Sequence, residues 1–145
     1  MTESAAATAA KPGLAAEIAR LASIIDRPDY SPGERASLRR WAPGQPIPLA
    51  FYRLWLKYLR AELPEERQAE AWMALAWGLA TCQRGCHTPG RPFGQALAES
   101  DFPEGRLERL LSAPEDVRIE LFMNAVRFLA SKGERFNWAE AAQFL

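Results

Sequence analysis

The sequence predicts an all-α protein, and three observations support this fold class. Apolar residues recur at helical spacing along most of the 145 residues. Strand-like alternation of apolar and polar residues is absent from the sequence. Residues that favour helix N-termini precede several of the apolar segments. We therefore expect a helical bundle of about seven to eight helices, with a larger N-terminal bundle and a smaller C-terminal lobe.

The first two helices are separated by a short break around Pro28. Residues 1–13 are expected to form a disordered tail, and the helix that follows is predicted over residues 14–26. Its apolar side is formed by four residues at helical spacing: Leu14, Ile18, Leu21 and Ile25. Ser31 then begins the second helix, where Glu34 completes a Ser-x-x-Glu capping box.

The middle of the chain holds the most apolar helix. A third helix, over residues 49–59, is apolar over most of its circumference. A fourth begins near Pro64 and carries no charged residue from Ala71 to Cys82. A helix that is apolar on all sides is normally buried, so we predict that it lies at the centre of the fold.

The remaining helices are shorter, with one exception. After a Gly- and Pro-rich loop over residues 84–92, helices are expected over residues 93–99 and 104–111. Ser112 and Glu115 repeat the capping pattern ahead of a long helix to Ser131, and Asn137 caps a last helix that reaches Leu145. These elements divide the chain into an N-terminal bundle (14–92) and a C-terminal lobe (93–145).

The charge of the chain is balanced, with 18 basic and 18 acidic residues, so affinity for a polyanion requires basic side chains gathered on one side. Between residues 35 and 61 there are basic residues but no acidic one. Helical spacing places them in two strips, Arg35, Arg39 and Arg40 in the first and Arg53, Lys57 and Arg60 in the second. These strips predict a face that binds nucleic-acid backbone, and the alternative is an ordinary solvated helix surface.

Two further features of composition bear on binding. Arginine outnumbers lysine 15 to 3, which suits phosphate recognition, although a GC-rich genome would produce the same excess. Aromatic residues near the basic strips could stack on bases, but they lie on the apolar sides of their helices and we expect most of them in the core: Trp41, Tyr52, Trp55 and Tyr58.

Residues for catalysis or metal binding are few. Cys82, Cys86 and His87 offer three soft ligands, but the chain has no fourth Cys or His to complete a structural zinc site. We interpret the two cysteines as a buried thiol pair and predict no metal, no cofactor and no enzymatic activity. Neither a disulfide framework, a signal peptide nor a membrane span is indicated, so a cytoplasmic location is expected.

Five short segments carry a resemblance to one family. They are GERASLRR at 33–40, AFYRL at 50–54, FGQALA at 93–98, RLERLLSA at 106–113 and NW at 137–138. In order and spacing they resemble motifs of the CasB-type small subunit of the type I-E CRISPR Cascade complex. Together they span about residues 33–145.

The resemblance implies a non-catalytic, all-helical subunit that is usually present in two copies per effector complex. Such a subunit contacts the crRNA-bearing backbone subunits and the large subunit, and it holds target DNA and the displaced strand during R-loop formation. Matching positions imply nucleic-acid contacts by Arg39, Arg40, Arg53, Arg106 and Arg127. Several members continue into a further basic segment, so we expect part of that surface to be missing here and affinity to depend on the assembled complex.

A second hypothesis is a helical protein-interaction adaptor with no direct nucleic-acid role. In that case the arginines would pair with acidic stretches such as residues 62–70. The two hypotheses differ in whether Arg39, Arg40 and Arg53 face solvent or carboxylates.

Overall fold

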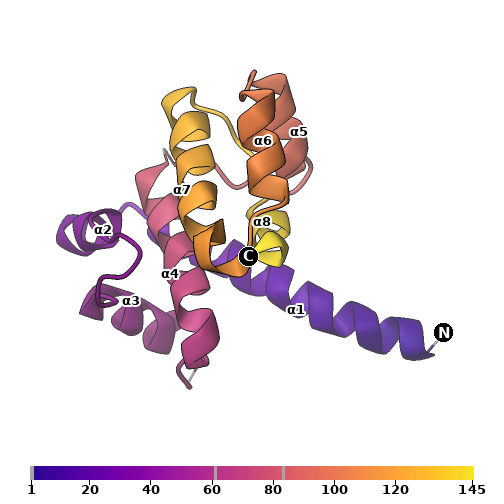
Figure 1. The fold of residues 1–145 in the computed structure, drawn as a ribbon. Coiled ribbons are helices and arrows are strands. Elements are labelled where there is room, and N and C mark those ends of the chain that lie inside the picture. The colour runs from indigo at the N-terminus through magenta and orange to yellow at the C-terminus, as the bar shows by residue number, and fades with distance from the viewer. Residues whose placement is uncertain (1, 61, 83) are drawn as a thin grey trace.

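A computed structural model of the protein describes residues 2–60, 62–82 and 84–145, with side chains from Gly13 onward. Within these residues the chain forms α-helices, one π-helical turn and no strand, which confirms the all-α prediction (Figure 1). The helices are α1 (Thr2–Ile25), α2 (Pro32–Arg39), α3 (Leu49–Leu54), the π-helical turn η1 (Trp55–Leu59), α4 (Glu66–Thr81), α5 (Phe93–Glu99), α6 (Glu104–Leu111), α7 (Glu115–Ser131) and α8 (Trp138–Phe144).

Helix α1 begins earlier than its apolar spacing indicates. The sequence predicted a disordered tail over residues 1–13, whereas α1 continues back to Thr2 and extends away from the other helices (Figure 1). This stretch is rich in alanine, which has the highest helix propensity and needs no apolar stripe to form a helix. The packed part of α1 lies further on, where Ile18, Leu21 and Ile25 are fully buried.

Helix α4 is the centre of the structure, as predicted. Every residue from Trp72 to Ala80 is buried, and α4 contacts α1, α2, α7 and α8. One continuous hydrophobic core extends from Ile18 on α1 to Ala141 on α8. This core crosses the boundary that we placed at residue 92, and the division of the chain into two units stays a prediction.

The predicted third helix changes its hydrogen-bond pattern halfway. After α3, the Arg60 N–H donates to the Trp55 carbonyl at 3.1 Å, five residues back rather than four. A π-helical turn is wider than an α-helical turn. The regular spacing that we assumed for Arg53, Lys57 and Arg60 is therefore interrupted after Trp55.

Aromatic side chains join the loop after α4 to the last two helices. The rings of Trp138 and Phe136 stack with their centroids 4.5 Å apart, and the ring centroids of Phe93 and Phe136 are 5.0 Å apart. The Trp138 indole Nε1–H donates to the Cys86 carbonyl at 3.3 Å. The Phe136 N–H also donates to that carbonyl, at 3.1 Å, so Cys86 anchors the segment between α7 and α8.

Two of the three predicted helix caps are confirmed. The Ser31 hydroxyl accepts from the Glu34 N–H at 3.3 Å, and the Asn137 side chain accepts from the Ala139 N–H at 2.9 Å. The prediction that Ser112 caps the following helix is wrong, because the Ser112 hydroxyl donates to the Glu108 carbonyl at 2.8 Å. Ser112 ends α6, and α7 starts after Pro114 without a side-chain cap. Among the described residues, no helix is long and apolar enough to cross a membrane.

The contact between α4 and α8 gives a first testable prediction. A Cβ atom at Gly78 would lie 2.4 Å from Cη2 and 2.6 Å from Cζ3 of the Trp138 ring. Gly78→Ala should therefore lower the free energy of unfolding by about 1–3 kcal/mol, as overpacking of a core does, despite the better helix propensity of alanine. The measurement is chemical denaturation followed by circular dichroism.

The matched control is Gly94→Ala on α5, where a Cβ atom would meet nothing within 4 Å. This variant should be as stable as the parent or slightly more stable. Equal stability of the two variants would contradict the close packing of Trp138 on α4.

Candidate nucleic-acid interface

Two of the predicted arginines lie free at the end of α2. Arg39 is the last residue of α2, Arg40 follows as its C-cap, and both side chains are exposed. Within the described part of the chain, neither forms an ion pair with a carboxylate. Their guanidinium groups are thus available to an external anion.

Arg35, on the same helix, is turned inward. Its guanidinium donates to the backbone carbonyls of Ala80, at 3.3 Å, and Ile25. These carbonyls belong to the ends of α4 and α1, where helix carbonyls lack intrahelical partners. Arg35 therefore holds three helices together, and the strip that helical spacing predicted with Arg39 and Arg40 is divided.

The second predicted strip is also divided. The Arg53 guanidinium pairs with the Glu34 carboxylate on α2 at 2.8 Å. Lys57 is exposed, and its ammonium lies 5.2 Å from the centroid of the Tyr58 ring. The capping role that we assigned to the Glu34 side chain is thus replaced by a contact between α2 and α3.

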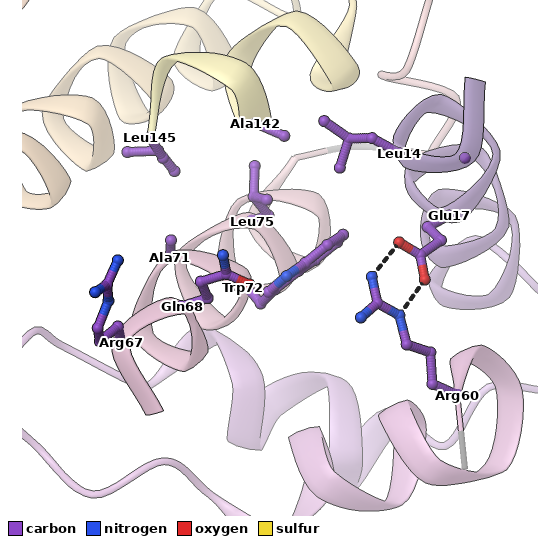
Figure 2. A pocket seen from close by; sticks show the side chains of 11 residues that line it. Leu14, Glu17, Arg60, Arg67, Gln68, Ala71, Trp72, Leu75, Ala142 and Leu145 are labelled. Atoms are coloured by element: carbon purple, nitrogen blue, oxygen red, sulfur yellow. Dashed lines mark hydrogen bonds and ion pairs between the residues drawn. The ribbon is translucent and has the colours of Figure 1, made fainter. Parts of the chain in front are cut away.

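Arg60 follows η1, and its side chain reaches α1. Figure 2 shows its guanidinium against the Glu17 carboxylate, with Nη2 and Oε1 2.6 Å apart and a second hydrogen bond from Nε to Oε2. This hydrogen bond to Glu17 raises the pKa of Arg60. The pair forms one wall of a hollow between α1, α4 and α8, and Arg67 forms another part of the rim.

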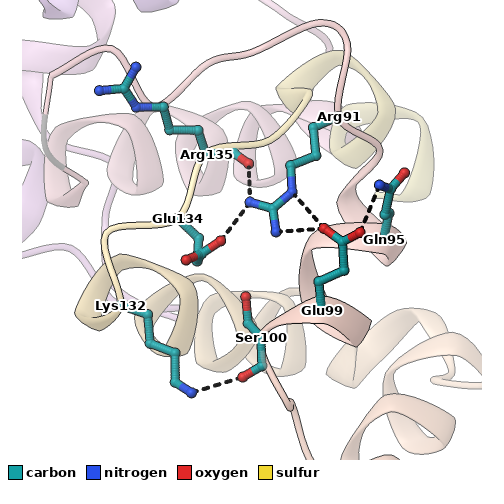
Figure 3. A network of polar contacts seen from close by, with 7 residues as sticks. All are labelled: Arg91, Gln95, Glu99, Ser100, Lys132, Glu134 and Arg135. Atoms are coloured by element: carbon teal, nitrogen blue, oxygen red, sulfur yellow. Dashed lines mark hydrogen bonds and ion pairs between the residues drawn. The ribbon is translucent and has the colours of Figure 1, made fainter.

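Arg91 forms ion pairs and a backbone hydrogen bond that connect separate segments of the fold. Its guanidinium contacts Glu134 at 2.6 Å and Glu99 at 3.0 Å, and donates to the Arg135 carbonyl at 3.0 Å (Figure 3). Hydrogen bonds to these two carboxylates raise the pKa of Arg91, and the bond to Glu134 has the larger effect. The loop before α5 is fastened in this way to the segment between α7 and α8.

Helices α6 and α7 bring together arginines that are distant from the basic stretch. Arg106 and Arg109 on α6 and Arg127 on α7 line one hollow of about 560 Å³, and none of its lining residues is acidic. The three side chains are exposed. The other residues that line this hollow, called the α6–α7 hollow from here on, are Phe102, Leu121, Asn124 and Phe128.

The sequence predicted Arg106 and Arg127 as contact residues but did not single out Arg109, which lines the same hollow. The signal was present, because Arg106 and Arg109 are three residues apart on a helix and so project from one side of it. Arg127 is held in place by donating to the Asn124 side-chain oxygen at 3.0 Å, and its guanidinium lies 5.0 Å from the centroid of the Trp77 ring.

The aromatic residues near the basic stretch belong mainly to the core, as expected. Trp41 and Trp55 are buried, and their indole N–H groups donate to the carbonyls of Gln45 and Glu62 at 3.1 and 2.7 Å. Tyr52 and Tyr58 are partly buried and pack against the same core.

The two thiols are buried at the C-terminal end of α4. Their mutual hydrogen bond and burial raise the pKa of Cys82, whereas the hydrogen bond from Cys82 lowers the pKa of Cys86. The His87 Nδ1 atom accepts a hydrogen bond from the backbone N–H of Trp138 at 3.1 Å, and burial lowers the pKa of His87. Among the described residues, no three His, Cys, Asp or Glu side chains are grouped to hold a metal ion.

Comparison with protein families shows to which family the chain belongs. A family model described as CRISPR-associated protein Cse2 matches residues 34–145, which include all the predicted basic contact residues. The chain belongs to this family. No curated protein and no solved structure matches the chain. The Cse2 family is the small, non-catalytic structural subunit of the type I-E CRISPR Cascade complex, so the resemblance found in the sequence is confirmed.

Arg35 and Arg39 lie on the same helix of this Cse2 family member but in different environments. Substitutions at the two positions should therefore differ in their effect on the free energy of unfolding. Arg35→Met should lower the free energy of unfolding by about 1.5–3 kcal/mol, because it removes charge-assisted hydrogen bonds and leaves partly buried carbonyls unpaired. Arg39→Met on the same helix is the control and should leave stability nearly unchanged. A similar loss for both variants would show that Arg35 is not the residue that joins α1, α2 and α4.

Proposed function

We propose that the chain is a non-catalytic Cascade subunit that binds nucleic-acid backbone through basic side chains and stabilises the R-loop during crRNA-guided antiviral defence. The observation that carries this proposal is the α6–α7 hollow. Arg106, Arg109 and Arg127 converge on it from two helices, and no carboxylate lines it. The exposed Arg39 and Arg40 add a second cationic site at the end of α2.

Arginine suits this task for a physical reason. Its planar guanidinium offers several N–H donors that match the oxygens of a phosphate, and it stays charged at any physiological pH. Such contacts do not depend on the base sequence, which suits a subunit that has to accept any target. R-loop formation exchanges one set of base pairs for another of similar stability, so a few backbone contacts are enough to favour the opened state.

The balanced charge of the chain indicates where this binding takes place. With equal numbers of basic and acidic residues, long-range attraction of the free chain to DNA is weak. We propose that the subunit acts within the assembled complex in the cytoplasm, in two copies. There it would contact the crRNA-bearing backbone subunits and the large subunit, together with the target DNA and the displaced single strand.

The ion pairs on the other predicted arginines favour a second candidate role. Arg53 pairs with Glu34 and Arg60 with Glu17, so these two guanidinium groups already meet carboxylates of their own chain. Lys57 lies between them in sequence, beside the exposed Leu56. These features suit a face that docks on protein, and the α3 side of the molecule would then be the adaptor surface of the same subunit.

Neutralising the α6–α7 hollow tests the proposed function. In Cascade assembled with the Arg106→Gln, Arg109→Gln, Arg127→Gln variant, target DNA should dissociate faster than from the parent complex. The slope of log K against log salt for a single strand should also become shallower by about 2, since each phosphate contact contributes about 0.7. Retention is measured by filter binding over a series of salt concentrations.

Arg67→Gln is the control, because Arg67 is exposed on α4 and lines a different hollow. It should leave both retention and the salt slope as they are in the parent complex. If the triple variant behaves like this control, the basic-hollow mechanism is wrong.

A second variant asks whether the α3 side also contacts nucleic acid. Glu34→Gln keeps the shape of the side chain but releases Arg53 from its ion pair. If Arg53 contacts a phosphate, target-DNA affinity should rise about threefold, because the competing surface ion pair is weak. Unchanged affinity would assign Arg53 to the fold or to protein contacts, and the readout is an equilibrium titration of the complex.

A further inference from the structure

The α6–α7 hollow has an apolar floor that phosphate binding by itself does not require. Three apolar residues line the hollow together with the arginines and are called its floor from here on: Phe102, Leu121 and Phe128, of which Leu121 and Phe128 are only partly buried. The rings of Phe102 and Phe128 meet edge to face, with centroids 5.1 Å apart and planes at 69°. Apolar surface of this kind gains free energy when a ligand covers it.

The polar groups around this floor are held in place. Arg127 is fixed by Asn124 and by the Trp77 ring beneath it. Lys132 donates to the Ser100 carbonyl at 2.9 Å, which holds its ammonium 4.9 Å from the centroid of the Phe128 ring. A hollow that is lined by both positively charged and apolar side chains matches a ligand that has a negative end and a flat apolar body.

We propose that the α6–α7 hollow binds one unpaired nucleotide of a single strand, with its phosphates on Arg106, Arg109 and Arg127 and its base against the floor of Phe102, Leu121 and Phe128. This inference rests on the proposed function and adds the base to the contacts that it assigns. The volume of about 560 Å³ lies within the range of small-ligand sites.

Single strands are favoured over a duplex for a geometric reason. In a duplex the faces of each base are covered by its neighbours, so the protein meets phosphates and base edges only. An unpaired base can leave the stack and place its face on apolar or aromatic side chains, and this contact tolerates any sequence. The hollow would therefore hold a strand that has been separated from its partner and would not read its sequence.

The test compares two oligonucleotides that differ only in their bases. The full chain is titrated at low ionic strength with a fluorescent oligothymidylate and with an abasic strand of the same length and charge, and anisotropy gives both affinities. The intact strand should bind about tenfold more tightly, as expected when one base is buried. Oligouridylate and its abasic form are run in parallel to show whether the strand held is DNA or RNA.

Variants localise the effect. Leu121→Asn makes the floor polar and leaves the arginines unchanged, so it should abolish the preference for the intact strand while the abasic strand binds as before. Leu111→Asn, at an exposed leucine of α6 outside the hollow, should keep the preference. Circular dichroism of both variants checks their folding, and the comparison of strands on the unaltered chain depends on no variant.

The possible failures are distinguishable. Equal affinity for intact and abasic strands, with both weakened by the triple arginine variant, would overturn the base contact and leave the proposed function standing. If neither strand binds, the nucleotide site is overturned, and the retention experiment on the assembled complex decides the proposed function separately.

Discussion

The structure depends on the burial of α4 and, within it, on the absence of a side chain at Gly78. Because Gly78 has no Cβ, the indole of Trp138 lies directly on the α4 backbone. Trp138 in turn stacks on Phe136 and donates to the Cys86 carbonyl, so this one contact positions α8 and the loop before α5. The contact lies within a core that joins both halves of the chain.

The basic side chains divide into two groups once this core is formed. Arg35, Arg60 and Arg91 are used by the fold, where each connects elements that are far apart in sequence. Arg39, Arg40 and the arginines of the α6–α7 hollow remain exposed. A chain with no net charge can still present cationic sites in this way, because its basic and acidic side chains are unevenly distributed and no acidic residue lines the α6–α7 hollow.

The exposed group suits the proposed binding of nucleic acid, with an affinity that rises on assembly. Isolated surface arginines gain little in water, since their charges are screened and their side chains are mobile. In the proposed complex, neighbouring subunits would exclude water and hold the nucleic acid close, and the same contacts would then become stronger. In the role proposed above, a neutral small subunit would bind nucleic acid only weakly when it is free and more strongly inside Cascade.

Local patterns in the sequence were sufficient to predict most of the helices, because hydrophobic periodicity and capping act over a few residues. They placed α4 at the centre, identified the caps Ser31 and Asn137, and carried motifs specific enough to indicate the family. The tertiary structure alone decided which arginines are free. Arg35 and Arg39 look equivalent in sequence, yet only Arg35 reaches the carbonyls at the ends of α1 and α4. The π-helical turn Trp55–Leu59 and the placement of Arg109 and Arg127 around one hollow likewise depend on packing between helices, which local spacing does not reveal.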